Sequence, residues 1–466
     1  MSMRRVKRES QEELWIAAPS LPRSPGHPFY ERLNGALREA GFDAFVEGEC
    51  APYYAECAGR PSIAPGVYFR SLFIGFFEGI GSERGIAWRL ADSMALRAFC
   101  GFALTEATPE HSSFTRIRQR LPLELHQRVF TWVLGVLTDA RLLRGATLGI
   151  DATTLEANAA MRSIVRRDSG DTYQEFLTDL AKASGIETPT REDLARVDKD
   201  RPGKGSNGDW THPHDPDARI TKMKDGRTHL AHKSEHAIDM DTGAIVAITV
   251  QGADQGDTAT VHQTLDEAKA NLAAVAQDPQ RRAQLKPLRQ LVGDKGYHSN
   301  YTLTILQNEH GLHTCVSEPA RGRRKWKNKR EEQKAVYKNR CRIRSEHGKK
   351  LLKKRGEFLE RAFAHLLETG GLRRTHLRGH GNILKRGLLH TAAFNLALLM
   401  RTLTGAGTPK GLAERCNTAA ACLYTLLQTL AELFRPAEDP QTRIQLTLIP
   451  TALPASGPNL SFSTGC

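Results

Sequence analysis

Apolar residues recur at helical spacing through residues 29–140. The stretch from Val67 to Phe77 is mostly apolar, and the stretch from Ile86 to Leu96 continues in the same style. Residues 108–121 begin with helix-capping side chains and go on as a basic amphipathic segment. The pattern predicts an all-α N-terminal domain, within which a helix-turn-helix and a small helical bundle fit the sequence equally well.

Strand patterns appear from residue 145 onward. Residues 148–155 form a short apolar run, and residues 236–250 predict two strands joined by a turn at Asp241-Thr-Gly. A hairpin followed by alternating helices and strands predicts an α/β domain over 145–403, with helices flanking a mixed sheet. The later elements expected are a helix near 258–275, strands at 288–294 and 313–316, and helices at 350–368 and 381–403.

Three parts of the chain lack these patterns. Residues 1–28 are charged and Pro-rich, and we expect a disordered basic N-terminus. Residues 160–228 are polar, with several His and Gly, and predict an insertion or a long loop within the α/β domain. Residues 404–466 form a C-terminal tail that contains one apolar helix and a Pro/Ser-rich end.

Positive charge is concentrated in one basic segment, residues 321–355. The formal net charge of the chain is +14, and this segment holds 17 Lys or Arg against three Glu, so it carries the whole surplus. Trp326 and Tyr337 lie among the basic residues. Because cations bind phosphates and aromatic rings stack on bases, the segment predicts a phosphate-contacting surface for nucleic acid rather than a solvated tail.

No feature of the sequence predicts a membrane protein or a secreted one. No apolar signal core follows the basic N-terminus, and no uncharged run reaches the roughly 18 residues that a membrane span needs. The eight cysteines include no CxxC pair. We therefore expect a soluble intracellular protein.

Two carboxylates lie on predicted strands of the sheet. Asp151 is in the middle of the first strand, in Gly149-Ile-Asp-Ala-Thr-Thr, and Asp294 ends a later strand, in Val292-Gly-Asp-Lys-Gly-Tyr. A charge buried in an apolar strand is costly unless it is paired or bound to a metal. A single such Asp is usually a turn former, whereas two on one small sheet favour a metal site.

The helix predicted at 350–368 supplies a third carboxylate. Its apolar residues follow helical spacing and define a buried face. They are Leu359, Ala362, Phe363, Leu366 and Leu367. At about 100° per residue Glu360 falls at the edge of that face, whereas Glu357 and Glu368 fall roughly opposite it. Glu360 is therefore the acid able to reach the sheet, although a boundary Glu paired with a Lys fits the periodicity equally well.

Three carboxylates suit Mg²⁺ or Mn²⁺, which prefer oxygen ligands. Two such ions about 4 Å apart activate an attacking oxygen and stabilise a leaving oxygen at a phosphodiester. Together with the basic segment, Asp151, Asp294 and Glu360 predict phosphoryl transfer on nucleic acid that depends on two divalent ions.

Five motifs occur along the chain between Tyr30 and Arg401 in a specific order and spacing. They are Ile150-Asp-Ala-Thr-Thr-Leu-Glu-Ala-Asn-Ala, Asp239-Met-Asp-Thr-Gly-Ala-Ile-Val, Gly293-Asp-Lys-Gly-Tyr-His-Ser, Leu359-Glu-Arg-Ala-Phe-Ala-His and Ala392-Ala-Phe-Asn-Leu. In these motifs the chain resembles the DDE transposases of bacterial insertion sequences. Its helical N-terminal region, with His111-Ser-Ser-Phe-Thr-Arg-Ile-Arg, is similar to the DNA-binding region of that family.

The resemblance implies an RNase H-like catalytic domain. It also implies that Asp151, Asp294 and Glu360 are a catalytic and metal-binding triad that uses two Mg²⁺ or Mn²⁺ ions. The reaction implied is cleavage at the ends of an insertion sequence, followed by strand transfer into target DNA. The resemblance also implies that the partner is double-stranded DNA and that a homodimer brings two DNA ends together. It implies a cytoplasmic location in a bacterium, in association with the nucleoid.

The chain departs from one subgroup of the family, which has a Tyr, an Arg and a Lys around the Glu. Lys353 and Gly356 lie where the Tyr and the Arg are expected. Other side chains near the triad are therefore candidates for holding DNA, and for Tyr297 a plain structural role is open as well. The candidates are Arg323, Arg324, Lys325, Lys327, Arg355, Arg361, Arg373, Arg374 and Tyr297.

Two other functions fit the same residues. An RNase H-like nuclease would cleave DNA without joining strands, and the sequence separates it poorly from a transposase. A non-catalytic DNA-binding protein derived from a transposase would keep the basic segment, but the presence of all three acids argues against it.

Overall fold

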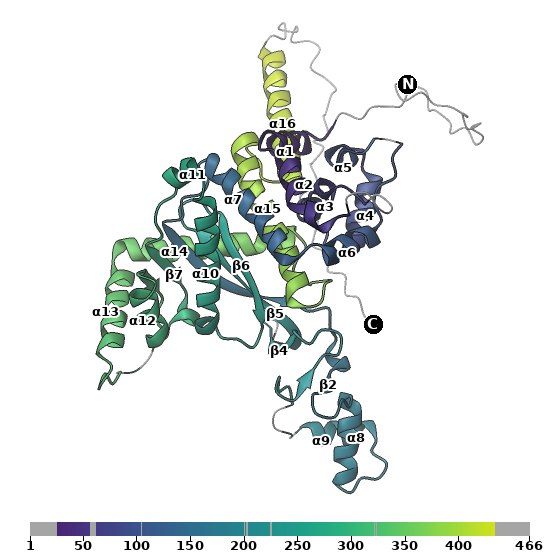
Figure 1. Cartoon of the computed structure of the whole chain (residues 1–466), viewed down its shortest axis with the longest axis vertical. Helices are drawn as coiled ribbons and strands as arrows, with labels where there is room; N and C mark the ends of the chain where they lie inside the picture. Colours follow the sequence, from purple (N-terminus) through teal and green to yellow (C-terminus); the bar gives the residue numbers. More distant parts are fainter. Residues whose placement is uncertain are drawn as a thin grey trace, which may run out of the picture. The chain divides into compact units, whose positions relative to one another are not determined.

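The computed structural model describes residues 26–433 except 56–61, 104, 200, 202–203, 224–225, 321 and 323. Residue contacts divide the chain into two compact units, Met1–Leu412 and Ala413–Cys466. The first unit contains the sheet and the helices α1 to α15 (Figure 1). The last helix, α16 (Pro409–Leu433), begins earlier than the helix predicted in the tail. Most of the predicted N-terminal segment and the end of the tail lie outside the described residues.

The N-terminal part of the first unit is helical, as the apolar spacing predicts. The helix α3 carries apolar side chains on all its faces instead of on one. Tyr68, Phe69 and Phe73 of this helix are therefore all fully buried. The stretch from Ile86 onward is two helices, and the Ser93 hydroxyl accepts the Leu96 N–H at the start of the second. The helices are α1 (Pro28–Glu39), α2 (Phe42–Cys50), α3 (Pro65–Phe77), α4 (Glu83–Asp92), α5 (Met94–Phe99), α6 (His111–Arg120) and α7 (Leu123–Asp139).

Six strands of the described chain form one mixed sheet. β5 lies antiparallel to β1 on one side, and it pairs with β4 and β6 along successive halves of its other side. β1, β7 and β8 are parallel to one another. The strands are β1 (Thr147–Glu156), β4 (Arg219–Lys222), β5 (Thr228–Asp239), β6 (Ile245–Gly252), β7 (Gln290–Gly293) and β8 (His313–Val316). The mixed sheet that the sequence predicts is therefore confirmed.

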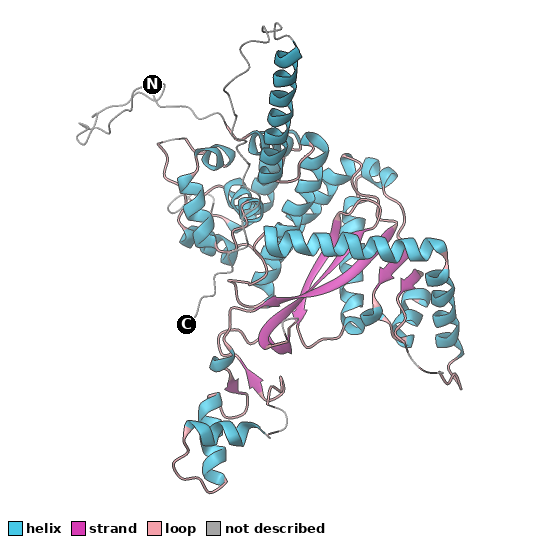
Figure 2. Cartoon of the chain, turned by 180° about the vertical axis from the view of Figure 1, so that it is seen from behind, coloured by secondary structure: helices cyan, strands magenta, loops and turns pink. Residues whose placement is uncertain are grey.

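Helices cover both faces of the sheet. Glu235 of β5 bonds to α10 (Asp257–Val275), whereas the next residue, His236, contacts Phe363 of α14 (Glu346–Ala364). Because successive strand residues point to opposite faces, α10 and α14 lie on opposite sides. Figure 2 shows α14 crossing the strands. α15 (His380–Thr404) covers the free edge of β6, where Asn395 bonds to both backbone groups of Ile245.

The polar segment predicted at 160–228 is a folded lobe, and the alternative of a long loop is wrong. The lobe contains a 3-10 turn (Met161–Ser163), β2 (Val165–Arg166), α8 (Tyr173–Ala183), α9 (Arg191–Lys199) and β3 (Trp210–Thr211). Trp210 is buried in a small core of its own together with Ile164 and Leu230. A second small core joins α8 to α9 and consists of Leu177, Ala181 and Leu194. The elements of the lobe are too short and polar to produce a clear periodicity, and these two small cores explain why they fold.

The basic segment also contains a helix that the periodicity does not reveal. α13 (Arg330–Arg344) buries only a narrow stripe, which includes Ala335 and Val336. It packs on β8 and α12 (Asn300–Asn308), and it leads through Ser345 into α14. The remaining described elements are a 3-10 turn (Ala51–Tyr53), α11 (Pro279–Gln284), a 3-10 turn (Lys295–Tyr297) and a π-helical turn (His365–Thr369) that extends α14.

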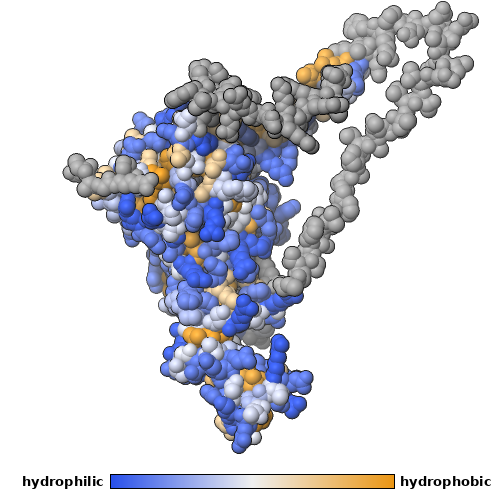
Figure 3. Space-filling view, turned by 90° about the vertical axis from the view of Figure 1, so that its right-hand side faces the viewer, coloured by the Kyte–Doolittle hydropathy of each residue, from blue (hydrophilic) through white to orange (hydrophobic). Residues whose placement is uncertain are grey.

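The molecular surface is mainly hydrophilic on the side that Figure 3 shows, with apolar side chains scattered over it. In the part of the chain that the structure describes, no helix combines the length and the apolar character needed to cross a membrane.

Candidate active site

Parallel pairing of β1 and β7 brings the two candidate aspartates to one place. Gly149 lies opposite Val292 in the register of these strands, so Asp151 and Asp294 occupy equivalent positions two residues further on. Asp151 continues within β1. Asp294 follows the end of β7 and caps the next turn by accepting the Gly296 N–H at 2.8 Å. The two neighbouring strands therefore place their carboxylates side by side.

Arg355 of α14 joins these two carboxylates. Its Nη2 lies 2.7 Å from Asp151 Oδ2 and 3.9 Å from Asp294 Oδ2. The same guanidinium donates from Nε and Nη2 to the Ile150 carbonyl, at 3.2 Å in each case. In this structure Arg355 is thus the counter-ion of the aspartate pair, and it is turned inward rather than toward solvent, where a DNA contact would place it.

The electrostatics of the pair favour a bound cation. Burial raises the pKa of Asp151 to about 6, the nearby Arg355 guanidinium acts in the lowering direction, and the charges of Asp294 and Asp257 raise it further. A carboxylate whose ionisation is opposed by burial and by like charges is stabilised by a metal ion. The oxygen donors present here fit Mg²⁺ or Mn²⁺, which prefer carboxylate ligands.

Glu360 lies on α14 beyond Arg355, with an exposed side chain. Its stretch of helix covers the aspartate pair, since Arg355 contacts Asp151 and the Phe363 ring lies 4.9 Å from that of His236, the cross-strand partner of Asp151. Among the described residues, no three His, Cys, Asp or Glu side chains form a group that could hold an ion. The structure therefore brings the two aspartates together and leaves Glu360 outside the pair.

The candidate DNA-binding residues differ in what their side chains do. Arg324 is turned inward, with Nη2 2.7 Å from Glu318 Oε1. Tyr297 is buried and donates its hydroxyl to Glu235 at 2.8 Å, which supports its structural alternative. Arg323 lies outside the described residues. The candidates with exposed or half-exposed side chains are Lys325, Lys327, Arg361, Arg373 and Arg374.

Three charged residues close to the pair escape the sequence prediction. Lys233 and Glu235 lie on β5, and Asp257 begins α10. The sequence prediction starts this strand at His236, so it leaves both β5 residues between the polar segment at 160–228 and the predicted strand. His232, Lys233, Ser234 and Glu235 are all polar, so no alternation of apolar and polar residues marks this part of β5 in the sequence.

Two transposase families match the chain. The family described as Transposase domain (DUF772) matches residues 22–120, which include α1 to α6. The family described as Transposase DDE domain matches residues 205–396, an interval that contains Asp294 and Glu360. The chain belongs to the DDE transposases. The DDE match begins downstream of Asp151, so the pairing of β1 with β7 is what connects that residue of the transposase to the site.

This DDE transposase is an enzyme of phosphoryl transfer on DNA, and its mixed sheet belongs to the RNase H-like class. The family works with divalent metal ions, in agreement with the donor set on β1 and β7. No curated protein sequence matches this transposase.

Proposed function

We propose that Asp151, Asp294 and Glu360 are the catalytic carboxylates of this transposase and that they hold two Mg²⁺ or Mn²⁺ ions. The observation that carries the proposal is the pairing of Asp151 and Asp294 on parallel strands, with Arg355 2.7 Å from one of them and 3.9 Å from the other. Glu360 joins the pair when its exposed side chain turns from solvent toward β1.

Ions bound there supply Lewis acids to the attacking and leaving oxygens of a phosphodiester. The Asp151 carboxylate is held by β1, which is fixed within the sheet, and the Asp294 carboxylate by the turn that directly follows β7. Arg355 remains anchored to the Ile150 carbonyl beside the pair, where its charge balances that of the two aspartates. Lys325 and Lys327, both exposed, add charge for the DNA backbone.

The proposed reaction has two stages. Cleavage at the ends of the insertion sequence frees a 3′-hydroxyl, and that hydroxyl then attacks a phosphodiester of the target DNA. We assign end binding to the helical domain at 29–140 and chemistry to the α/β domain at 145–403, with a homodimer pairing the two ends. The match of the first part to a transposase domain and of the second to a DDE domain supports this division.

The direct test is cleavage of labelled linear DNA that carries the sequences flanking the gene. We expect nicking in Mg²⁺, none in EDTA, and a loss of at least about 100-fold for Asp151→Asn, Asp294→Asn and Glu360→Gln, because each removes a charged ligand. Glu357→Gln is the matched control, since Glu357 lies on the same helix, is exposed and pairs with Arg361.

Strand joining is read in the same reaction after addition of a target plasmid. Joined products in Mg²⁺ would support transposition, whereas nicked ends without joining would point to a nuclease. Binding of the DNA without cleavage in Mg²⁺ or Mn²⁺ would overturn the assignment of the three carboxylates.

A further inference from the structure

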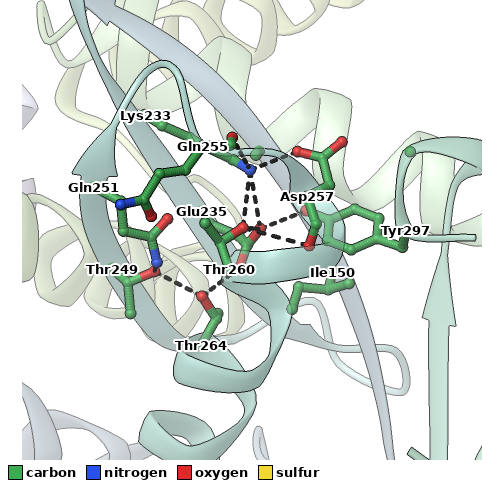
Figure 4. Close-up of polar contacts among 12 residues, drawn as sticks. Ile150, Lys233, Glu235, Thr249, Gln251, Gln255, Asp257, Thr260, Thr264 and Tyr297 are labelled. Carbon is green, nitrogen blue, oxygen red and sulfur yellow. Dashed lines mark hydrogen bonds and ion pairs between the residues drawn. The ribbon is translucent and has the colours of Figure 1, made fainter. Parts of the chain in front are cut away.

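A buried ionic network lies on the face of the sheet opposite Arg355 (Figure 4). Glu235 of β5 is fully buried, and Lys233, two residues earlier on the same face, is almost fully buried. Lys233 Nζ lies 3.7 Å from Glu235 Oε1 and 2.6 Å from Asp257 Oδ1. Charges are buried in this way only when they are well paired and hydrogen-bonded, so the surroundings of the network are informative.

Every oxygen of the Glu235 carboxylate has donors. Oε1 accepts the hydroxyls of Thr260 at 2.7 Å and Tyr297 at 2.8 Å, and Oε2 accepts the Thr264 hydroxyl at 2.5 Å. Since Thr264 donates to Glu235, its oxygen is free to accept from Thr249, 2.6 Å away. Thr260 and Thr264 belong to α10, so Glu235 fastens that helix to β5.

The same network holds the turn that carries Asp294. Tyr297 is three residues after Asp294, at the far end of the turn, and its hydroxyl is bonded to Glu235. Gly296 packs against Asp257, the ion-pair partner of Lys233. A Cβ at position 296 would lie 2.1 Å from Asp257 Oδ2. The turn is therefore fixed at two successive residues by groups that both depend on β5.

The Asp294 carboxylate lies close to this network. The point where a Gly296 Cβ would be is 2.1 Å from Asp257 Oδ2 and 3.1 Å from Asp294 Oδ1, so these two oxygens are at most about 5.2 Å apart. A small rotation of the turn would move Asp294 relative to Asp151, whose strand is fixed by pairing with β5 along its whole length. The geometry of the aspartate pair thus depends on the turn.

We propose that Lys233 and Glu235 are positioning residues of the metal site, which act through Asp257 and Tyr297 to fix the Asp294 turn. The inference rests on the proposed function of the aspartate pair. Groups that orient metal ligands from outside the coordination sphere typically change metal affinity by about 10–100-fold when they are removed. Neither Lys233 nor Glu235 touches the substrate in this arrangement, because both lie on the face opposite Arg355.

The test measures Mn²⁺ binding to the full chain by electron paramagnetic resonance. Each variant is measured at a temperature at which circular dichroism shows that it is folded. Tyr297→Phe removes one hydroxyl and leaves the ring in place, and we expect Mn²⁺ affinity about tenfold weaker than that of the parent. Tyr301→Phe is the matched control, because the Tyr301 side chain is 71 % exposed. A purely structural role for Tyr297 would lower the unfolding temperature and leave Mn²⁺ affinity unchanged.

A double-mutant cycle with Glu235→Gln tests whether the two residues act through their shared hydrogen bond. If they do, the double variant with Glu235→Gln and Tyr297→Phe has the same Mn²⁺ affinity as whichever single variant binds Mn²⁺ more weakly, or a higher one. Fully additive losses would overturn the proposal. Asp151→Asn separates the two levels of inference. If it retains parental Mn²⁺ binding, the metal site itself is wrong; if it loses binding while Tyr297→Phe does not, only the positioning role fails.

Discussion

Arg355 Nη2 lies 2.7 Å from Asp151 Oδ2, and the same guanidinium is held by the carbonyl of Ile150, the residue directly before that aspartate. The counter-ion is therefore anchored to the strand whose charge it neutralises. This arrangement keeps the carboxylate and its partner in register whether or not a second cation is present. It also reduces the electrostatic cost of placing two acids side by side beneath a helix, because the Arg355 charge acts to lower the pKa of Asp151.

Asp151→Asn is expected to stabilise the metal-free protein at neutral pH. The pKa of Asp151 is about 6 in the folded chain and 3.8 when unperturbed, so between these values the folded state binds more protons than the unfolded state. Stability is then fully present below pH 3.8 and falls as pH rises through 6. Because Asn does not ionise, Asp151→Asn does not lose this free energy of unfolding. The loss in the parent is about 3 kcal/mol above pH 6, at about 1.4 kcal/mol per pKa unit.

Urea unfolding in EDTA at pH 5 and pH 7.5 measures the difference in unfolding free energy between Asp151→Asn and the parent. This difference should be larger at pH 7.5. Removing the guanidinium supplies a second check. In an Arg355→Gln background the pKa of Asp151 rises further, so the benefit of adding Asp151→Asn becomes larger and reaches its full size at a higher pH. A benefit that is independent of pH would contradict the electrostatic explanation.

Lys325 and Lys327 are expected to contact DNA phosphates. Each lysine that neutralises a phosphate releases counterions, so replacing both by Ala should reduce the slope of log K against log salt by about 2. Fluorescence anisotropy with a labelled duplex over a salt series gives this slope. Lys182 and Lys199 of the lobe, replaced together, are the control that should leave the slope unchanged. Equal slopes for both double variants would exclude the two lysines from the DNA surface.

Asn395→Ala is expected to destabilise the fold through the edge of the sheet. The fully buried amide accepts the Ile245 N–H at 2.9 Å and donates to the Ile245 carbonyl at 2.8 Å, so it completes the free side of β6. Two buried backbone groups left without partners cost about 2–4 kcal/mol. Chemical denaturation of Asn395→Ala measures this loss. Asn308→Ala, at an exposed position, should change stability by less than about 0.5 kcal/mol.

The sequence predicts the sheet well where apolar runs have clear ends. The strand at 313–316 has the predicted bounds. Asp151 lies on β1 and Asp294 directly follows β7, and these two strands lie side by side as predicted. The helix α13 is missed because its buried stripe is short and is interrupted by Lys and Arg. The buried polar Asn339 also belongs to that stripe, and it bonds to both backbone groups of Val316, a contact that no apolar periodicity contains.

The site itself is harder to predict than the strands. Periodicity places Glu360 at the edge of a buried face, but which flank of α14 turns toward Asp151 depends on how the helix crosses the sheet. Arg355 illustrates the difficulty, since its position in a basic run suggests solvent, whereas its side chain is 11 % exposed beside Asp151. The bond of Tyr297 to Glu235 joins residues 62 positions apart in sequence, and no local pattern contains it.

The segment that forms the lobe leaves the sheet at the end of β1 and returns to it at the start of β5, and these two points are neighbours in the sheet. Glu156, the last residue of β1, is the cross-strand partner of Ala231 near the start of β5. The intervening chain is therefore topologically a long hairpin connection, and its Trp210 core is separate from the main core. A change in the length or composition of this connection would therefore alter what the protein touches without changing the strand register that aligns Asp151 with Asp294.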